Sequence, residues 1–418
     1  MEYDNTAYDT RPTPVRRRRA RLKDYRDTEK RGTVDVPFAV LTLIILTLGI
    51  LMVLSASYAR AYYIDGNPTL YFVKHLLFAI SGIGFMYAAS LLPMSFYQRF
   101  SLTLLVISIA MLMLVPIIGV RVNGAKRWIK LVGSFNFQPS EIVKLAVVLS
   151  FSKLICVYND QMKTFRYGVV PFAIILAVIV GLLLLEPHLS ASIIILALGA
   201  VMMFAGGTEM KWFGIGFLGI VILGALILPH ISYAANRFNS WRDPFSDLQG
   251  YGWQIIQSLY AVGSGGFLGL GLGQGRQKYL YLPEEHNDFI FAVLCEELGF
   301  VGATLVLILF ALLIIRGYWL ALHARNKYSA LVVTGITSLL ALQVFLNVAV
   351  VTNLVPCTGI SLPFFSYGGT ALWIQMAEMG IVLSASREIP LKREKGRLSE
   401  AKRKAEAASN EEYGRELG

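Results

Sequence analysis

The chain has 418 residues, of which 55% are hydrophobic and only 16% are charged, and its formal net charge is +11. Such a composition, with long uncharged runs, excludes a soluble globular domain and predicts a protein with several membrane spans. The three cysteines, Cys156, Cys295 and Cys357, are spaced for neither a disulfide framework nor a cysteine-based metal site.

The N-terminal segment 1–34 is polar and contains a run of four arginines, Arg16–Arg19. We expect a basic cytoplasmic tail that is held at the anionic inner leaflet. A nucleic-acid-binding arm is the weaker alternative, because no folded module accompanies the arginines, so no nucleic-acid partner is expected. At the other end, residues 387–418 form a second tail that is rich in Lys, Arg and Glu.

Between the tails, residues 35–386 contain ten apolar runs, each near the roughly 20 residues that a membrane-spanning helix requires. The runs lie near 36–57, 70–92, 101–119, 142–158, 168–185, 189–206, 213–229, 288–316, 329–352 and 367–385. We therefore predict an all-α polytopic membrane protein with ten transmembrane helices.

Lysines and arginines in the short connections predict the orientation, because these residues concentrate on the cytoplasmic side of a membrane. If the N-terminus is cytoplasmic, the C-terminus is too, and the inner connections contain Arg99, Lys163–Arg166, Lys211 and Arg316–Lys327. The outer connections are then 58–69, 120–141, 186–188, 353–366 and the large loop 230–287 between the seventh and eighth helices.

The outer segment 120–141 departs from this charge rule, because it carries four cations. These are Arg121, Lys126, Arg127 and Lys130. One explanation is chance combined with a weak topogenic signal. The other is an anionic partner that binds the four cations at the outer leaflet.

The large outer loop combines a predicted helix with a glycine-rich stretch. Ile255, Ile256 and Leu259 share one face beside Trp253, which predicts an amphipathic helix that lies on the bilayer. The glycines of residues 265–275 allow backbone bends that either cradle a phosphate or permit close packing. No Lys-Ser/Thr pair follows them, so the stretch is not a nucleotide P-loop. The loop also supplies the cations Arg237, Arg242, Arg276 and Lys278.

Charged residues within the apolar runs are costly, so each one is a candidate functional residue. Glu141 and Lys144 share a helical face at i and i+3, either as a structural ion pair or as residues that order a substrate cavity. Glu296 and Glu297 are expected to pair with groups on other helices, and Glu378 is expected to be structural.

Asp288 lies where the eighth apolar run begins. There it is either a helix cap or a carboxylate that faces water at the polar–apolar boundary. A protein that works outside the cell has no nucleotide, so its substrate must bring its own leaving group, as a lipid diphosphate does. Outer-loop cations would stabilise the departing diphosphate, and a single carboxylate would act as general base. We therefore place the chemistry at Asp288.

Seven motifs within residues 36–386 resemble the SEDS family (shape, elongation, division and sporulation), nearer to its FtsW/SpoVE branch than to RodA. The motifs are N-G-A-K-R-W-I at 123–129, Q-P-S-E-I-V-K at 138–144, G-Y-G-W-Q-I-I-Q-S at 250–258, G-L-G-L-G-Q-G at 269–275, L-P-E-E-H-N-D-F-I-F at 282–291, E-E-L-G at 296–299 and L-P-F-F-S-Y-G-G-T at 362–370.

The resemblance implies a peptidoglycan glycosyltransferase of the cytoplasmic membrane whose active site faces outward. Family members polymerise lipid II, release undecaprenyl diphosphate, and serve cell division, cell shape or sporulation. They work with a class B penicillin-binding protein, a transpeptidase, and with division or elongation proteins. A lipid II flippase and a scaffold that recruits a transpeptidase are the alternatives.

The family's essential acid falls on Asp288, which also becomes the candidate ligand of a divalent cation, Mg²⁺ or Mn²⁺. The other candidate residues are contacts of the substrate: Lys126, Arg127, Glu141, Lys144, Arg237, Arg242, His286 and Glu296. Two positions depart from the family pattern, because many members have an acid where this chain has His188 and a threonine where it has Asn287.

Overall fold

The computed structural model describes residues 32–122, 125–130, 136–227, 232–248 and 250–389. The described helices and strands belong to one unit of the chain, Val34–Ile389. The predicted tails, 1–34 and 387–418, lie almost entirely outside the described residues, and their predicted cytoplasmic location stays a prediction.

A helix occupies each of the ten predicted runs, because a helix bonds its own backbone groups and so tolerates an apolar solvent. Among the described residues these helices are α2 (Val36–Tyr63), α3 (Leu70–Leu91), α4 (Met94–Ile118), α5 (Pro139–Tyr158), α7 (Val170–Leu185), α8 (Leu189–Gly206), α9 (Met210–Ile227), α12 (Ile290–Leu322), α13 (Lys327–Val351) and α14 (Gly369–Ser386). The short helices η1 (Asn159–Lys163) and α6 (Phe165–Gly168) connect α5 to α7.

Seven helical segments in the described part of the chain are long and apolar enough to cross a membrane. They are α2, α3, α4, α8, α12, α13 and the segment Phe165–Leu185, which contains α7. The prediction of an all-α polytopic membrane protein is therefore confirmed, whereas the count of ten spans stays a prediction. Of the other three helices, α5 carries the charged residues Glu141, Lys144 and Lys153 within its 20 residues.

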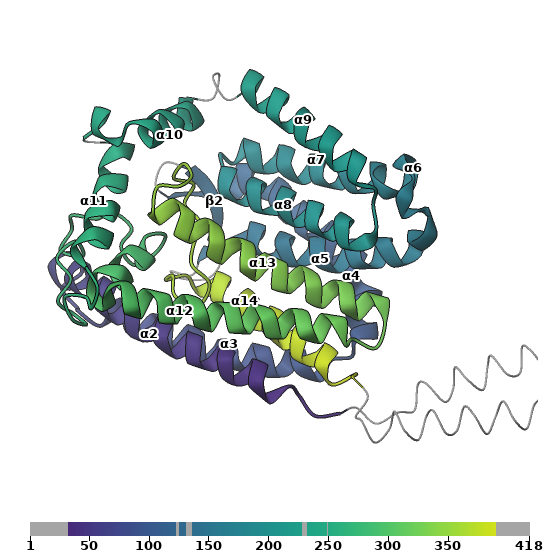
Figure 1. The fold of residues 1–418 in the computed structure, drawn as a ribbon, viewed down its shortest axis with the longest axis horizontal. Helices are drawn as coiled ribbons and strands as arrows, with labels where there is room; N and C mark the ends of the chain where they lie inside the picture. Colours follow the sequence, from purple (N-terminus) through teal and green to yellow (C-terminus); the bar gives the residue numbers. More distant parts are fainter. Residues whose placement is uncertain (1–31, 123–124, 131–135, 228–231, 249, 390–418) are drawn as a thin grey trace, which may run out of the picture. The chain divides into compact units, whose positions relative to one another are not determined.

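The predicted inner connections meet at one end of the bundle. The backbone N–H of Asp35, before α2, donates to Ser386 Oγ at the end of α14 (3.1 Å). Arg316 Nε near the end of α12 donates to the Asp35 carboxylate (3.0 Å). Lys327 at the start of α13 donates to Asn159 Oδ1 after α5 (2.7 Å). Successive long helices therefore alternate in direction, and the described ends of the chain lie together (Figure 1).

Three short strands follow α4, where the sequence predicted only a cationic loop. β1 (Val120–Val122), β2 (Ala125–Lys130) and β3 (Asn136–Phe137) form an antiparallel sheet in the order β1-β2-β3. The sheet fixes the direction of the cations at 126 and 127, because successive side chains of a strand point to opposite faces.

The large connection between α9 and α12 contains α10 (Ser232–Arg242), η3 (Pro244–Ser246) and α11 (Tyr251–Ser264), which lie at one end of the long helices (Figure 1). The prediction that α11 lies on the bilayer is wrong. Ile255 and Ile256 are buried within the protein, and Ser258 Oγ donates to the carbonyl oxygen of Val351 on α13 (2.8 Å). The apolar face of α11 therefore packs against neighbouring helices of the protein.

The glycine-rich stretch packs against α12, so the close-packing explanation is confirmed. The backbone N–H groups of Leu270 and Gly271 donate to the carbonyl oxygens of Glu296 and Glu297, each at 3.0 Å. The chain bends at Gly299 inside α12 (φ 66°), and a Cβ there would collide with the backbone of residues 267–269. Glycine is required at 299 for both reasons.

The prediction that the two acids inside α12 pair with groups on other helices is confirmed, among the long helices, only for Ser55 of α2, because their other partners lie in the connection before α12. The Glu297 carboxylate accepts hydrogen bonds from Lys278 Nζ (2.6 Å), Ser55 Oγ (2.6 Å) and the backbone N–H of Gly273 (3.0 Å). The Glu296 carboxylate accepts from the backbone N–H of Arg276 (2.9 Å). The bent loop backbone therefore cradles the protein's own carboxylates.

Candidate functional site

Four of the five predicted outer connections converge on one cavity of about 420 Å³. The lining includes residues of β2 and α5, the turn before α8 and the start of α8. Residues of α10, α11 and the segment 283–288 also line the cavity. The α13–α14 connection and α14 complete the lining. The fifth outer connection reaches the same end, because Arg60 Nη1 lies 3.8 Å from Glu285.

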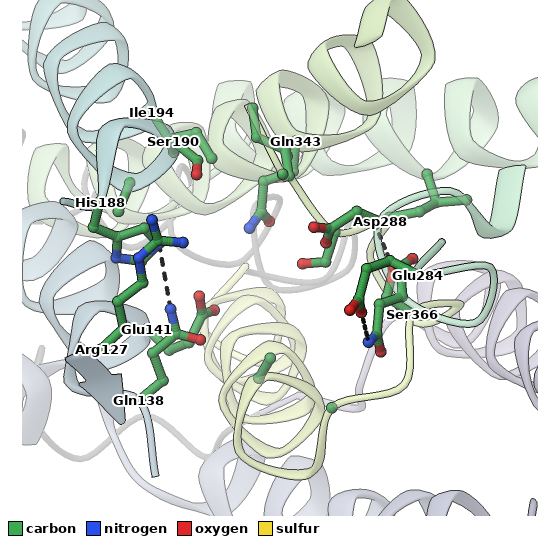
Figure 2. Close-up of a pocket in the computed structure, with 18 of the residues that line it drawn as sticks. Arg127, Gln138, Glu141, His188, Ser190, Ile194, Glu284, Asp288, Gln343 and Ser366 are labelled. Atoms are coloured by element: carbon green, nitrogen blue, oxygen red, sulfur yellow. Dashed lines mark hydrogen bonds between the residues drawn. The ribbon is translucent and has the colours of Figure 1, made fainter. Parts of the chain in front are cut away.

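Asp288 lies in this cavity, in the turn before α12, and its side chain is half-buried (Figure 2). It is not the residue that caps the helix, which is Phe289. Gly359 lies against the carboxylate, since a Cβ at that position would come within 3.0 Å of Asp288 Oδ2. The segment 283–288 and the α13–α14 connection therefore form the surroundings of the Asp288 carboxylate together.

Burial and the neighbouring Glu284 carboxylate raise the pKa of Asp288 to about 6, although Arg237, Arg127 and His286 act in the opposite direction. The carboxylate is therefore mostly ionised at neutral pH but is a stronger base than an ordinary aspartate. A general base works best when its pKa lies near the operating pH.

Two of the predicted outer-loop cations line the cavity with Asp288. Arg127 Nη2 donates to the carbonyl oxygen of Pro187, and Arg237 Nη1 donates to that of Cys357 (2.6 Å). Figure 2 shows Arg127 on the opposite side of the cavity from Asp288 and Glu284. Arg127 and the two carboxylates Asp288 and Glu284 therefore lie on opposite sides of the cavity.

Glu141 and Lys144 form a buried ion pair of 2.8 Å at the start of α5, and both residues line the cavity. The two explanations left open by the sequence are therefore compatible, because one ion pair both neutralises the charges and shapes the cavity.

The other four candidate residues do not line this cavity in the part of the chain that the structure describes. Lys126 Nζ donates to the carbonyl oxygen of Pro116 (3.1 Å), and Arg242 is exposed at the end of α10. His286 packs behind the site against Tyr71, with 4.9 Å between ring centroids. Glu296 is buried in the hydrogen bonds of the glycine-rich stretch.

His188, the departure from the family pattern, lines the cavity beside Arg127 (Figure 2). Its Nε2 lies 3.4 Å from Gln138 Nε2. Burial and the nearby Arg127 and Lys144 lower the pKa of His188 to about 3, so the imidazole is neutral. Burial also raises the pKa of Glu186 to about 8, so that carboxyl is mostly protonated at neutral pH. Neither group therefore cancels the positive charge of Arg127.

Several polar residues of the lining were not predicted from the sequence. Gln343 and Gln375 lie on α13 and α14 and are buried, and Ser366 lies in the α13–α14 connection. A signal for the two glutamines was present, because an uncharged polar side chain in an apolar run also needs a partner or a cavity. Ser366 lies inside a motif that was attributed to the family without a role.

The described residues contain no group of three His, Cys, Asp or Glu side chains that could hold a metal ion. Asp288 could serve as a single carboxylate ligand of a divalent cation. Mg²⁺ is often bound through one or two carboxylates and completed by substrate phosphates and waters.

Comparison with known proteins gives the family. The FtsW/RodA/SpoVE family model, described as "Cell cycle protein", matches residues 36–390. Stage V sporulation protein E of Bacillus subtilis is 40% identical over 364 residues, which cover 86% of this chain and 99% of that protein. The probable peptidoglycan glycosyltransferase FtsW of Trichlorobacter lovleyi is 36% identical over 360 residues, which cover 85% and 94% of the two chains.

Two solved structures have the same fold. A chain of a peptidoglycan synthase complex that coordinates polymerisation and crosslinking superposes with a TM-score of 0.71 at 28% identity, covering 85% of this chain and 98% of that one. The rod shape determining protein RodA of Thermus thermophilus superposes with a TM-score of 0.64 at 26% identity, covering 86% and 98%. The chain therefore belongs to the FtsW/RodA/SpoVE family, the SEDS family of peptidoglycan glycosyltransferases.

Proposed function

We propose that this protein polymerises lipid II into glycan strands at the outer face of the cytoplasmic membrane, with Asp288 as the general base. The observation that carries the proposal is a cavity that Asp288 and Arg127 line from opposite sides. A base and an anion-binding group on opposite sides are what the displacement of a diphosphate requires.

In the proposed reaction, the 4-hydroxyl of the terminal GlcNAc of one lipid II attacks the anomeric carbon of the lipid-linked MurNAc of the growing chain. Asp288 accepts the hydroxyl proton as the new C–O bond forms. The bond between the anomeric carbon and the diphosphate breaks, and undecaprenyl diphosphate leaves with the electron pair. Attack opposite the leaving group converts the α-linked donor into a β-1,4 bond.

The two arginines that line the cavity would bind the departing diphosphate. Arg127 and Arg237 both carry guanidinium groups, which bind phosphate oxygens through paired N–H donors. His188 is neutral and Glu186 is mostly protonated, so neither of these two neighbours offsets the charge of Arg127. Lys126 and Arg242 lie outside the lining, so we expect smaller effects from them.

As the alternative to its role as general base, Asp288 would help to hold a divalent cation, Mg²⁺ or Mn²⁺. When bound, it supplies positive charge to the leaving group. Asp288, Arg127 and Arg237 orient the substrates in either case.

We further propose that all ten long helices cross the membrane and that the cavity opens outward. The alternating direction of the helices supports ten spans, as does the hydrogen bond between Asp35 and Ser386, which joins the start of α2 to the end of α14 at one end of the bundle. The connections at the other end of the bundle from the cavity contain the excess of Lys and Arg. This excess supports a cytoplasmic location for that end and an outward-facing cavity.

The proposed partner is a class B penicillin-binding protein, a transpeptidase that would crosslink the strands made here, in division, elongation or sporulation. The solved peptidoglycan synthase complex, one chain of which has this fold, supports such a pairing.

The deciding experiment is polymerisation of lipid II by the purified full chain in detergent, with the partner transpeptidase added in a parallel sample. We expect glycan strands that grow with time. A flippase or a scaffold makes none, because detergent offers no second compartment and lipid II is the only substrate.

In a second experiment the same reaction is treated with a chelator. EDTA should stop the reaction, and Mg²⁺ or Mn²⁺ should restore it. Unchanged activity with EDTA would refute only the cation proposal.

The raised pKa of Asp288 predicts the pH dependence of polymerisation. Protonated Asp288 cannot accept a proton, so kcat/KM should fall as the pH drops through about 6, where an ordinary aspartate would give a fall near pH 4. The Glu284→Gln variant should move this fall to lower pH, because Glu284 raises the pKa of Asp288. A profile that is flat down to pH 5, or that Glu284→Gln moves upward, would contradict the assignment.

A further inference from the structure

The backbone of the segment that carries Asp288 is held at three successive carbonyl groups. The N–H of Tyr367 donates to the carbonyl oxygen of His286 (2.9 Å), and Ser366 Oγ donates to that of Asn287 (2.8 Å). The third is the carbonyl oxygen of Asp288 itself, which accepts from Asn347 Nδ2 (2.8 Å). The first two bonds come from the α13–α14 connection, whereas the third comes from inside α13.

The Asn347 side chain uses both of its N–H donors. The second donates to the carbonyl oxygen of Ile360 (2.6 Å), which follows Gly359 in the chain. Gly359 is the residue whose backbone lies against Asp288 Oδ2. One amide therefore joins the backbone of Asp288 to the backbone that touches the Asp288 carboxylate.

Asn347 is fully buried and, in the described part of the chain, does not line the cavity. It lies one turn along α13 from Gln343, which does line the cavity. Asn347 therefore has no route to the substrate except through the groups that it holds.

We infer that Asn347 is a positioning residue, whose amide sets the distance and direction of the Asp288 carboxylate relative to the Gly359–Ile360 backbone and hence to the acceptor hydroxyl. The inference rests on the proposed function, because it assigns Asn347 to the same reaction. Displacement of a reacting group by about 1 Å costs on the order of 100-fold in rate. Loss of the two hydrogen bonds donated by Asn347 should therefore lower kcat.

The test compares three variants of the full chain by lipid II polymerisation. Asn347→Leu keeps a similar volume and removes both donors, Asn347→Asp keeps the shape and removes the amide, and Asn347→Gln keeps the amide. We expect the first two to lose about tenfold or more in kcat with KM within about twofold, because the substrate contacts are unchanged. Asn347→Gln should retain more activity than either.

A purely structural role is the rival explanation, and Asn326→Ala is the matched control. Asn326 lies at the other end of α13, where its Oδ1 accepts from the backbone N–H of Ser329 (2.8 Å). This control should lower the melting temperature without changing kcat. If the loss of activity in the Asn347 series follows melting temperature, or is equal in all three variants, the positioning role is refuted.

An activity-independent measurement separates this inference from the proposed function. Hydrogen exchange of the backbone amides at residues 286–289 should be faster in Asn347→Leu than in the unsubstituted protein, because one end of the segment is released. If exchange is faster but the unsubstituted protein does not polymerise lipid II, the proposed function is refuted while the positioning of the Asp288 segment by Asn347 is supported. Unchanged exchange together with unchanged kcat would refute the positioning role of Asn347.

Discussion

Asp288→Asn is expected to abolish polymerisation of lipid II while leaving the folded protein intact. Asparagine has the shape of aspartate but cannot accept the proton of the attacking hydroxyl. Removal of a general base costs about 10²- to 10⁴-fold in rate. The backbone carbonyl of residue 288, which Asn347 holds, is unaffected by the change. We therefore expect strand formation below the detection limit and normal abundance in the membrane.

Asp160→Asn is the matched control for this substitution, because Asp160 is exposed in η1 at the opposite end of the bundle. It should polymerise lipid II at the rate of the unsubstituted protein. Activity of Asp288→Asn above about a tenth of that rate is too high for a missing general base. Such a result would move the base to another residue of the cavity, of which Glu284 and Glu141 are the carboxylates.

Lys278→Met is expected to give the largest loss of stability. Lys278 and Glu297 form a buried pair, with 2.6 Å between Nζ and Oε1 and side chains that are 3% and 0% exposed. Removal of one partner leaves an uncompensated charge in the interior, which typically costs about 3–5 kcal/mol. Thermal unfolding in detergent should show a melting temperature lower by roughly 5 °C or more, given the usual size dependence.

Two further variants make this prediction specific. Lys211→Met removes a lysine from an exposed ion pair with Glu209, and such pairs contribute about 0–1 kcal/mol, so its melting temperature should barely change. The double variant Lys278→Met with Glu297→Gln should recover part of the loss, because no buried charge is left unpaired. If Lys278→Met melts like Lys211→Met, the pair at Glu297 contributes little to stability.

The sequence predicted the helices well because each helix forms its backbone hydrogen bonds within its own segment. A run of about 20 apolar residues must form a helix in lipid whatever its neighbours are, and all ten runs do form helices. The pairing of Glu296 and Glu297 was predictable for the same kind of reason, because a charge at that depth must find a partner. The identity of the partners was not, since Ser55 lies 242 residues from Glu297 in the chain and Lys278 was expected only as one of several outer-loop cations.

The cationic residues were harder to assign from sequence. Arg127 lines the cavity and Lys126 does not, because neighbouring side chains of β2 point to opposite faces. In the sequence the two residues are equivalent members of one cationic segment. Similarly, the apolar face of α11 had the pattern of a helix on a bilayer, and only the packing against α13 shows that protein covers it.

The sequence by itself determined the membrane class, the positions of the ten helices and the segment that carries Asp288, because composition, run length and local motifs are properties of neighbouring residues. Only the tertiary structure decided which cations face Asp288, that His188 is neutral among them, and that Asn347 holds the backbone of Asp288. These are contacts between segments far apart in the chain, and their energies depend on distance and burial, which exist only once the helices have packed.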